Sequence, residues 1–271
     1  MNDTVKLTFP ELFKESVREN KENVFLSFVD EKPYTYRFAD QKISASIAFL
    51  EQMGVNPGDK VAILSTNMPN WGIIYLATTF MGAIAVPILP DFQTSEIRNV
   101  LEHSESNTLF VSHGLLKKLD EDTKNLVSNI IRVDDLSVIS SNSHSVAFDI
   151  DSSPEKQYHV EEDDLASIIY TSGTTGKSKG VMLTHKNIAY TAIATKYIQP
   201  VNSSDRFLSI LPLSHTYENT LGFIIPMTSG ASVYYLKKPP TASALLPALK
   251  KVKPTLILSV PLVIEKMYKN K

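Results

Sequence analysis

Short apolar runs, separated by longer helix-like segments, recur along most of this chain. They occupy residues 61–64, 85–89, 108–111, 130–133, 165–170, 207–211, 232–236 and 255–258. Apolar runs that alternate with helical segments are typical of parallel sheets covered by helices. The alternation therefore predicts an α/β fold, built as two successive wound β/α subdomains with mostly parallel sheets.

The order of these segments predicts four regions, which are an amino-terminal helix and hairpin layer, 1–60; a first α/β subdomain, 61–137; a Ser-rich surface linker, 138–160; and a second α/β subdomain, 161–271. The amino-terminal layer would contain a helix at 10–19, a hairpin at 24–36 and a helix at 38–53. The last residues begin a further helix and then stop. We therefore expect the second subdomain to be incomplete at its carboxyl end.

Residues 61–90 carry no charged side chain, and such a stretch is long enough to cross a bilayer. Pro69 and Pro87 interrupt it, however, and Gly72 and Gly82 dilute its apolar character. Elements that are covered on all sides in an α/β domain are equally apolar. We interpret the stretch as a strand, a buried helix and a second strand, and we predict no membrane span.

Composition narrows the classes of function. The chain has 271 residues and is 43% hydrophobic, which is enough for one large core or two adjoining ones. Its net charge of −2, without an isolated cluster of Lys and Arg, argues against a nucleic-acid partner. The absence of cysteine excludes a disulfide framework, a thiolate nucleophile and Cys-ligated metals. It is compatible with the cytoplasm, where we expect the protein.

The loop at 171–180, TSGTTGKSKG, combines glycine, hydroxyl and lysine directly after an apolar strand. Glycines let the backbone turn tightly and approach a ligand, and successive amide groups can form an anion-binding concavity. The hydroxyls add donors and groups able to ligate magnesium, while the lysines add positive charge. Because ligands of parallel sheets gather at the carboxyl ends of strands, the loop predicts a polyphosphate site.

Two other interpretations of this loop are weaker. A flexible Gly/Ser/Thr surface loop fits the composition but not the setting between an apolar strand and VMLTHKNI. The P-loop of nucleoside triphosphatases needs a glycine at position 171, where Thr171 stands, and a helix directly after the lysine. Residues 180–183 are strand-like instead, so we reject the P-loop.

YTSGTTGKSKGVMLTHKNI, at 170–188, resembles the signature of the adenylate-forming superfamily, which includes acyl-CoA synthetases, luciferases and peptide-synthetase adenylation domains. Four further segments are similar to motifs of that family in the same order: VNPGDKVAILSTNMPNW, FMGAIAVPILPDFQ, LPLSHTYENT and KPTLILSVPLVIEKMY. The resemblance covers nearly the whole chain and is greatest to bacterial long-chain fatty acid–CoA ligases. Ser178 replaces the usual proline of the signature.

The resemblance implies a role for each residue of the loop. The cofactor-binding residues would be Thr171, Ser172, Gly173, Thr174, Thr175, Gly176 and Gly180. Lys179 would contact the ATP phosphates as a catalytic residue, and Thr174 would also be the metal ligand.

The resemblance also makes His215, in LPLSHTYENT, a catalytic residue beside the adenylate and the acyl entrance. A purely structural alternative stays open, in which the side chain of His215 caps the following helix, and Ser214 and Thr216 offer similar caps. We expect His185 to be structural, near a helix start. The other histidines show no metal-ligand spacing and are expected to be solvated.

The implied reaction is ATP-dependent activation of a fatty acid to acyl-AMP, followed by transfer to coenzyme A, with Mg²⁺. A long fatty acid would permit peripheral membrane contact. The family's magnesium-binding glutamate motif, ribose-binding aspartate and carboxy-terminal domain have no counterpart here, so we expect this chain alone to be inactive. Two alternatives stay open: adenylation of an aryl or amino acid, and a non-catalytic nucleotide-binding or scaffold relative.

Overall fold

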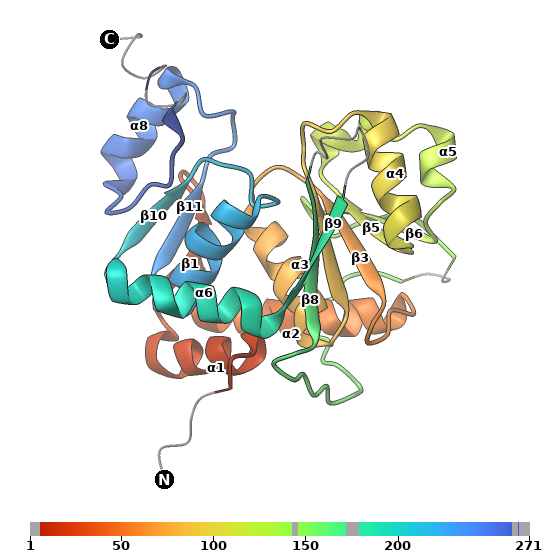
Figure 1. Ribbon diagram of the computed structural model, residues 1–271, viewed down its shortest axis with the longest axis horizontal. Helices are drawn as coiled ribbons and strands as arrows, with labels where there is room; N and C mark the ends of the chain where they lie inside the picture. Colours follow the sequence, from red (N-terminus) through yellow and green to blue (C-terminus); the bar gives the residue numbers. More distant parts are fainter. Residues whose placement is uncertain (1–5, 143–145, 172–178, 262–264, 266–271) are drawn as a thin grey trace.

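The computed structural model describes residues 6–142, 146–171, 179–261 and 265. Two β-sheets stand side by side in it, with helices between them and on their outer sides (Figure 1). The helices are α1 (Phe9–Asn20), α2 (Tyr36–Gln52), α3 (Pro69–Phe80), α4 (Thr94–Ser104), the 3₁₀-helix η1 (His113–Lys118), α5 (Glu121–Lys124), α6 (His185–Ile198), the π-helix η2 (Glu218–Ile224), α7 (Ile225–Met227) and α8 (Ala242–Val252).

The larger sheet has seven strands in the order β7-β6-β5-β3-β4-β8-β9. Its strands are β3 (Lys60–Leu64), β4 (Ile84–Ile88), β5 (Thr108–Val111), β6 (Asn129–Arg132), β7 (Val138–Ser141), β8 (Leu165–Thr171) and β9 (Lys179–Thr184). The five inner strands run parallel, and β7 and β9 pair antiparallel at the two edges. The carboxyl ends of β3, β4, β5, β6 and β8 therefore share one edge of the sheet.

The smaller sheet has four strands in the order β10-β11-β1-β2. These are β1 (Val24–Phe28), β2 (Tyr34–Thr35), β10 (Arg206–Ser209) and β11 (Ser232–Tyr235). β1, β10 and β11 run parallel, and β2 closes the edge as the antiparallel arm of a hairpin. This sheet thus joins an amino-terminal strand to two strands from the far end of the chain.

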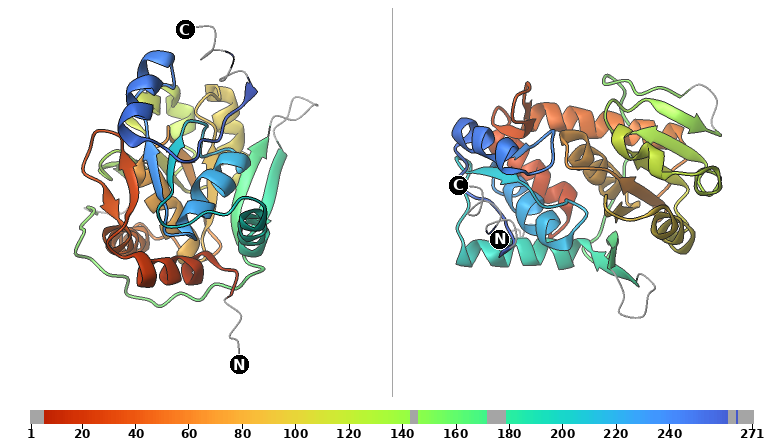
Figure 2. Two further views of the ribbon diagram at one scale, coloured as in Figure 1. Left: turned by 90° about the vertical axis from the view of Figure 1, so that its left-hand side faces the viewer. Right: turned by 90° about the horizontal axis from the view of Figure 1, so that it is seen from above.

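The alternation of side chains along each strand builds separate cores. In β3, Val61 and Ile63 face the core between the two sheets, whereas Ala62 and Leu64 face the core beneath α4. A third, small cluster joins α8 to the outer face of the four-stranded sheet. The view from above in Figure 2 places α8 and α4 on opposite sides of the molecule. The five layers are helix, sheet, helix, sheet and helix.

The helices between the sheets begin and end where their sequences predict. α2 starts at a Thr35 cap, whose side chain accepts a hydrogen bond from the amide of Phe38, and Gly54 follows its end with φ of 81°. His185 begins α6, is fully buried, and accepts a hydrogen bond at Nδ1 from the amide of Phe9 at 3.2 Å. The expected structural role of His185 is thus confirmed.

The uncharged stretch 61–90 forms β3, α3 and β4, as predicted, and nearly all of its residues are buried. α3 has 12 residues and begins at Pro69, because a proline is tolerated in the first turn of a helix. Within the described part of the chain, no helix is both long and apolar enough to cross a membrane.

Strands from different regions of the four expected from the sequence pair with one another. The boundaries of these regions stay a prediction. β8 and β9 join the sheet of the first block, and β1 of the amino-terminal layer lies inside the smaller sheet. The linker prediction was wrong at β7, because an antiparallel edge strand exposes alternate residues and needs no apolar run. The strand predicted at 255–258 is reduced to one bridge between Leu256 and Phe207, in a run flanked by Pro254 and Pro261.

Candidate functional site

The carboxyl ends of the parallel strands of both sheets meet at one cleft. Two adjoining cavities of about 670 and 620 Å³ occupy it. Their shared walls are Thr66, Asn67, Gly114, Leu115, Leu236 and Lys237, which follow β3, β5 and β11. The remaining walls come from segments after β1, β4, β6 and β10. Ligands of α/β sheets bind outside the carboxyl ends of strands, so this cleft is the candidate site.

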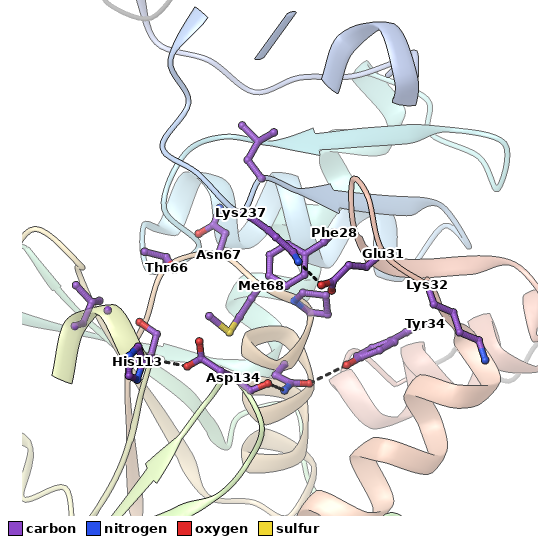
Figure 3. Close-up of a pocket in the computed structure, with 16 residues that line it drawn as sticks. Phe28, Glu31, Lys32, Tyr34, Thr66, Asn67, Met68, His113, Asp134 and Lys237 are labelled. Carbon is purple, nitrogen blue, oxygen red and sulfur yellow. Dashed lines mark hydrogen bonds and ion pairs between the residues drawn. The ribbon is translucent and has the colours of Figure 1, made fainter. Parts of the chain in front are cut away.

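Apolar and polar side chains line the larger cavity together (Figure 3). Phe28 and Met68 supply apolar surface. The ammonium of Lys237, after β11, forms an ion pair with Glu31 in the turn of the β1–β2 hairpin. The carboxylate of Asp134 accepts a hydrogen bond from the amide of His113 at 2.8 Å, which fixes the start of η1. These polar side chains are therefore held by contacts within the protein.

The smaller cavity is strongly basic. Four lysines line it, Lys117, Lys118, Lys237 and Lys238, against one carboxylate, Asp91. The ammonium of Lys118 donates to the carbonyls of Pro90 at 2.7 Å and Phe92 at 2.9 Å. Lys237 is already paired with Glu31, and the positive charge that remains suits an anionic ligand.

The base of the predicted phosphate loop lies at the carboxyl end of β8. Thr171 pairs with Lys179, and Tyr170 pairs with Gly180, across β8 and β9. Ser172, Gly173, Thr174, Thr175 and Gly176 fall within 172–178, outside the described residues. A strand, β9, follows the loop, and the next helix begins only at His185, which supports the rejection of a P-loop.

The residues at this base have the chemistry that phosphate requires. The side chains of Thr171 and Lys179 are exposed, and they place a hydroxyl and an ammonium group on neighbouring strand ends. Hydroxyl and ammonium donors fit the oxygen atoms of a triphosphate. Among the described residues there is no group of three or more His, Asp or Glu side chains that could hold a metal ion. The predicted metal ligand, Thr174, lies outside them.

Gly180 lets the ring of Tyr170 cross the base of the loop. A Cβ atom at Gly180 would lie 2.8 Å from the Cγ2 atom of Ile168 and 3.2 Å from the Cζ atom of Tyr170. The hydroxyl of Tyr170 forms a 2.7 Å hydrogen bond with Nδ1 of His103, on α4. His103 was expected to be only solvated, and its spacing in the sequence gave no signal of this contact.

His215 stands after β10, on the smaller sheet. Its carbonyl accepts a hydrogen bond from the amide of Asn219 at 2.8 Å, so its backbone begins the helical segment. Its side chain is exposed. In the described structure, no side-chain hydrogen bond from His215, Ser214 or Thr216 caps that helix, and none joins His215 to Thr171, Lys179 or Gly180. The backbone therefore supports the helix start, and the side chain is free for a ligand.

Glu218, three residues after His215, was missed by the sequence reasoning. Its side chain is 1% exposed, and Oε1 accepts a 2.6 Å hydrogen bond from the hydroxyl of Ser209, the last residue of β10. Burial raises the pKa of Glu218 to about 8, although the bond from Ser209 acts in the opposite direction. The signal available in the sequence was a single acid in an otherwise uncharged run, TYENTLGF.

Comparison with curated proteins finds relatives along most of the chain. It is 27% identical over 285 residues to probable acyl-activating enzyme 16 of Arabidopsis thaliana, covering 96% of this chain and 39% of that protein. It is 32% identical to tyrocidine synthase 2 of Brevibacillus parabrevis over 85% of this chain and 6% of that protein. A long-chain fatty acid–CoA ligase of Mycobacterium bovis, FadD15, is 29% identical over 85% of this chain and 39% of the ligase.

Solved structures show the same fold. The amino-terminal domain of FACL13 from Mycobacterium tuberculosis, with a bound inhibitor, matches with a TM-score of 0.82 and 22% identity, covering 97% of this chain and 65% of that one. O-succinylbenzoate coenzyme A synthetase from Bacillus subtilis, in complex with ATP and magnesium, matches with a TM-score of 0.80 and 22% identity over 96% and 51%. The chain thus spans less than two thirds of the length of each of these proteins.

The family model described as AMP-binding enzyme matches residues 13–271. This match includes both sheets, the base of the phosphate loop and His215. The chain therefore belongs to the AMP-binding enzyme family.

Proposed function

We propose that the full-length protein is an AMP-forming acid–thiol ligase that converts a fatty acid into its coenzyme A thioester. In the first step a carboxylate oxygen of the acid bonds to the α-phosphorus of ATP, and the bond to pyrophosphate breaks. In the second step the thiol of coenzyme A loses its proton, its sulfur bonds to the acyl carbon, and AMP leaves.

One observation carries this proposal. In a chain of the AMP-binding enzyme family, Thr171 and Lys179 stand on paired strand ends at the carboxyl edge of β8. Both reactants of the first step are anions, so catalysis depends on neutralising their charge and aligning them. Lys179 would neutralise the phosphates, while Thr171 and Gly180 would hold them from the two strands. Magnesium, when bound near Thr174, would add further positive charge to the triphosphate.

His215 and the basic cavity are proposed to serve the acyl and thiol substrates. His215 has an exposed side chain and follows β10 three residues after Pro212, which lines the smaller cavity. Lys117, Lys118 and Lys238 of the smaller cavity have no ion pair among the described residues, and they offer charge for the phosphates of coenzyme A. The name of the FadD15 relative, a long-chain fatty acid–CoA ligase, supports a fatty acid as the substrate.

The test is ATP–pyrophosphate exchange by the full-length gene product, across acids from acetate to palmitate, benzoate and amino acids. We expect exchange to be greatest with a fatty acid. Lys179→Ala should lower it by about 100-fold or more, since it removes charge that stabilises the transferring phosphates. Lys250→Ala, at an exposed position on α8, is the matched control and should have no effect. Absence of exchange with every acid, from a folded protein, would overturn the proposal.

The 271-residue chain by itself gives a second comparison. We propose that it does not form acyl-adenylates, because the family's remaining motifs have no counterpart in it. Fatty-acid-dependent exchange by this chain at the rate of the full-length protein would contradict that expectation.

A further inference from the structure

Asn67 ties the two sheets together at the cleft. It lies between β3 and α3 of the larger sheet and lines both cavities (Figure 3). Its Nδ2 donates to the hydroxyl of Ser209 at 2.9 Å and to the carbonyl of Leu211 at 2.6 Å. Its Oδ1 accepts from the amide of Leu213 at 2.9 Å. One amide side chain thus makes three hydrogen bonds to the segment that leads from β10 to His215.

Ser209 passes this connection on to Glu218. Its hydroxyl accepts from Asn67 and donates to Oε1 of Glu218 at 2.6 Å. Ser209 is 3% exposed and Glu218 is 1% exposed. The buried hydroxyl of Ser209 thus accepts one hydrogen bond and donates the other. The chain of bonds runs from the amide of Asn67 through this hydroxyl to the carboxyl group of Glu218. Removing either end leaves a buried polar group unsatisfied.

Glu218 begins the π-helix, at the far end of the same loop. Gly222 leaves room for its carboxyl group, because a Cβ atom there would lie 2.7 Å from Oε1 of Glu218. The next residue, Asn219, is fully buried, donates its amide hydrogen to the carbonyl of His215, and accepts a 3.4 Å hydrogen bond from the hydroxyl of Tyr75. Short π-helical segments occur frequently at functional sites, where they aim particular side chains.

We propose that Asn67 and Glu218 are positioning residues, which hold the segment 211–215 from its two ends and thereby fix His215 just beyond the cavity-lining residues Leu211 and Pro212. Asn67 holds Leu211 and Leu213, and Glu218 holds Ser209 and the start of the helix. The segment carries no strand pairing in the described structure, and its own backbone bond, from the amide of His215 to the carbonyl of Pro212 at 2.9 Å, only closes a turn within it. These side chains therefore attach the turn to the two sheets. The inference rests on the proposed function only for the role of His215. The hydrogen-bonded geometry stands without that role.

A double-mutant cycle in the full-length protein separates positioning from general stability. Asn67→Ala, His215→Ala and the double variant are compared by ATP–pyrophosphate exchange with the best acid. We expect Asn67→Ala to lower kcat by about 10- to 100-fold, because small displacements of an aligned group have effects of that size. The KM for ATP should stay unchanged, since Asn67 makes no contact with the loop base. The double variant should be no slower than His215→Ala alone.

Glu218 is tested by a conservative pair. Glu218→Gln keeps an oxygen that can accept from Ser209 and should retain most of the kcat. Glu218→Leu removes that acceptor and should behave like Asn67→Ala. Asn125→Ala, at an exposed site after α5, is the matched control for the asparagine substitution. Additive losses in the cycle, or equal losses in Glu218→Gln and Glu218→Leu, would overturn the positioning role.

A readout without activity keeps this test distinct from that of the proposed function. Amide hydrogen exchange is measured for the peptide covering 210–217 in the same full-length variants. The amide of Leu213 should exchange hydrogen faster in Asn67→Ala and at the wild-type rate in Asn125→Ala, each compared with the amides of β5 and β6 in the same variant, so that a change in global stability is taken into account. If the wild type catalyses no exchange with any acid, the proposed ligase fails, and this measurement still decides whether Asn67 holds the segment. An unchanged rate of amide hydrogen exchange at Leu213 in Asn67→Ala would refute the inference.

Discussion

The base of the phosphate loop depends on the close packing of Tyr170 against Gly180. Tyr170 lies flat toward β9 because Gly180, opposite it, has no side chain. Its hydroxyl is then held by His103, from α4, the helix that covers this face of the sheet. Tyr170, the last residue but one of the strand before the loop, is therefore fixed by contacts to both α4 and β9.

Gly180→Ala should destabilise the protein by roughly 1–3 kcal/mol, since the added methyl group would overlap Ile168 and crowd Tyr170. Urea denaturation measures the change. Gly114→Ala is the matched control, because a Cβ atom there meets nothing within 4 Å. Equal midpoints for the two variants would show that the ring of Tyr170 moves aside freely.

The residues of the site differ in how far the sequence predicts them. The loop residues were predicted because their chemistry lies in one continuous run. Asn67 and Glu218 were not, since their roles depend on contacts made by folding. Asn67 meets Ser209 across 142 residues of sequence, and an isolated asparagine after a strand carries no signal of that partner. His103 was likewise predictable only from its contact with Tyr170, 67 residues away.

At the scale of helices and strands, local signals are reliable where a cap or a breaker marks the end. Thr184 is the last residue of β9 and the cap of α6, and its side chain accepts from the amide of Asn187 at 3.1 Å. In turn, the amide of Thr184 donates to Oδ1 of Asn187 at 3.0 Å. This capping box turns the chain directly from the strand that follows the loop into the helix that contacts the π-helix.

Thr184→Ala should therefore lower the free energy of unfolding by about 1 kcal/mol. Thr241 stands at the same position before α8 but makes no capping hydrogen bond, so Thr241→Ala should lower the free energy of unfolding less. Thermal denaturation of the two variants provides the measurement. The idea is contradicted by a larger loss at Thr241 than at Thr184.

Which strands share a sheet is a longer-range property than which residues form a strand. The apolar runs of β3, β4, β5 and β8 were predicted from their own sequences. The partners of the strands were not predicted, because a local pattern does not encode which strands pair. β4 pairs with β8 in the larger sheet, and β1 pairs with β11 in the smaller one. The edge strand β7 was missed for a related reason, since it is paired on one side and half exposed.

At the scale of the whole molecule, two buried groups give stability opposite dependences on pH. Burial lowers the pKa of His185 to about 4 in the folded protein. As the pH falls below about 6.5, His185 is therefore protonated in the unfolded chain before it is protonated in the folded protein. Burial raises the pKa of Glu218 to about 8, so the folded protein keeps its proton while the unfolded chain releases it above about 4.5. The first effect destabilises the fold in acid, and the second destabilises it as the pH rises.

Between about pH 4.5 and 6.5 the two slopes cancel, and from 6.5 to 8 only Glu218 acts. Stability should then fall by roughly 2 kcal/mol across that upper window, at about 1.4 kcal/mol per pH unit. Glu218→Gln, which does not titrate, should remove this fall and leave the decline below pH 4.5 unchanged. Denaturant midpoints at half-unit intervals of pH measure it, and an unaltered fall in Glu218→Gln would assign the effect to another group.

The smaller sheet sets an order of events during synthesis. β1 leaves the ribosome early, but its parallel partner β11 is made about two hundred residues later, an interval of roughly 10–40 s at usual translation rates. β2 can pair with one edge of β1 almost at once, but the other edge, beside Phe25 and Leu26, lacks its partner strand throughout that interval. The growing chain therefore has a long period in which an apolar strand with one open edge is accessible to chaperones or to other chains, and this period ends only when β11 is made.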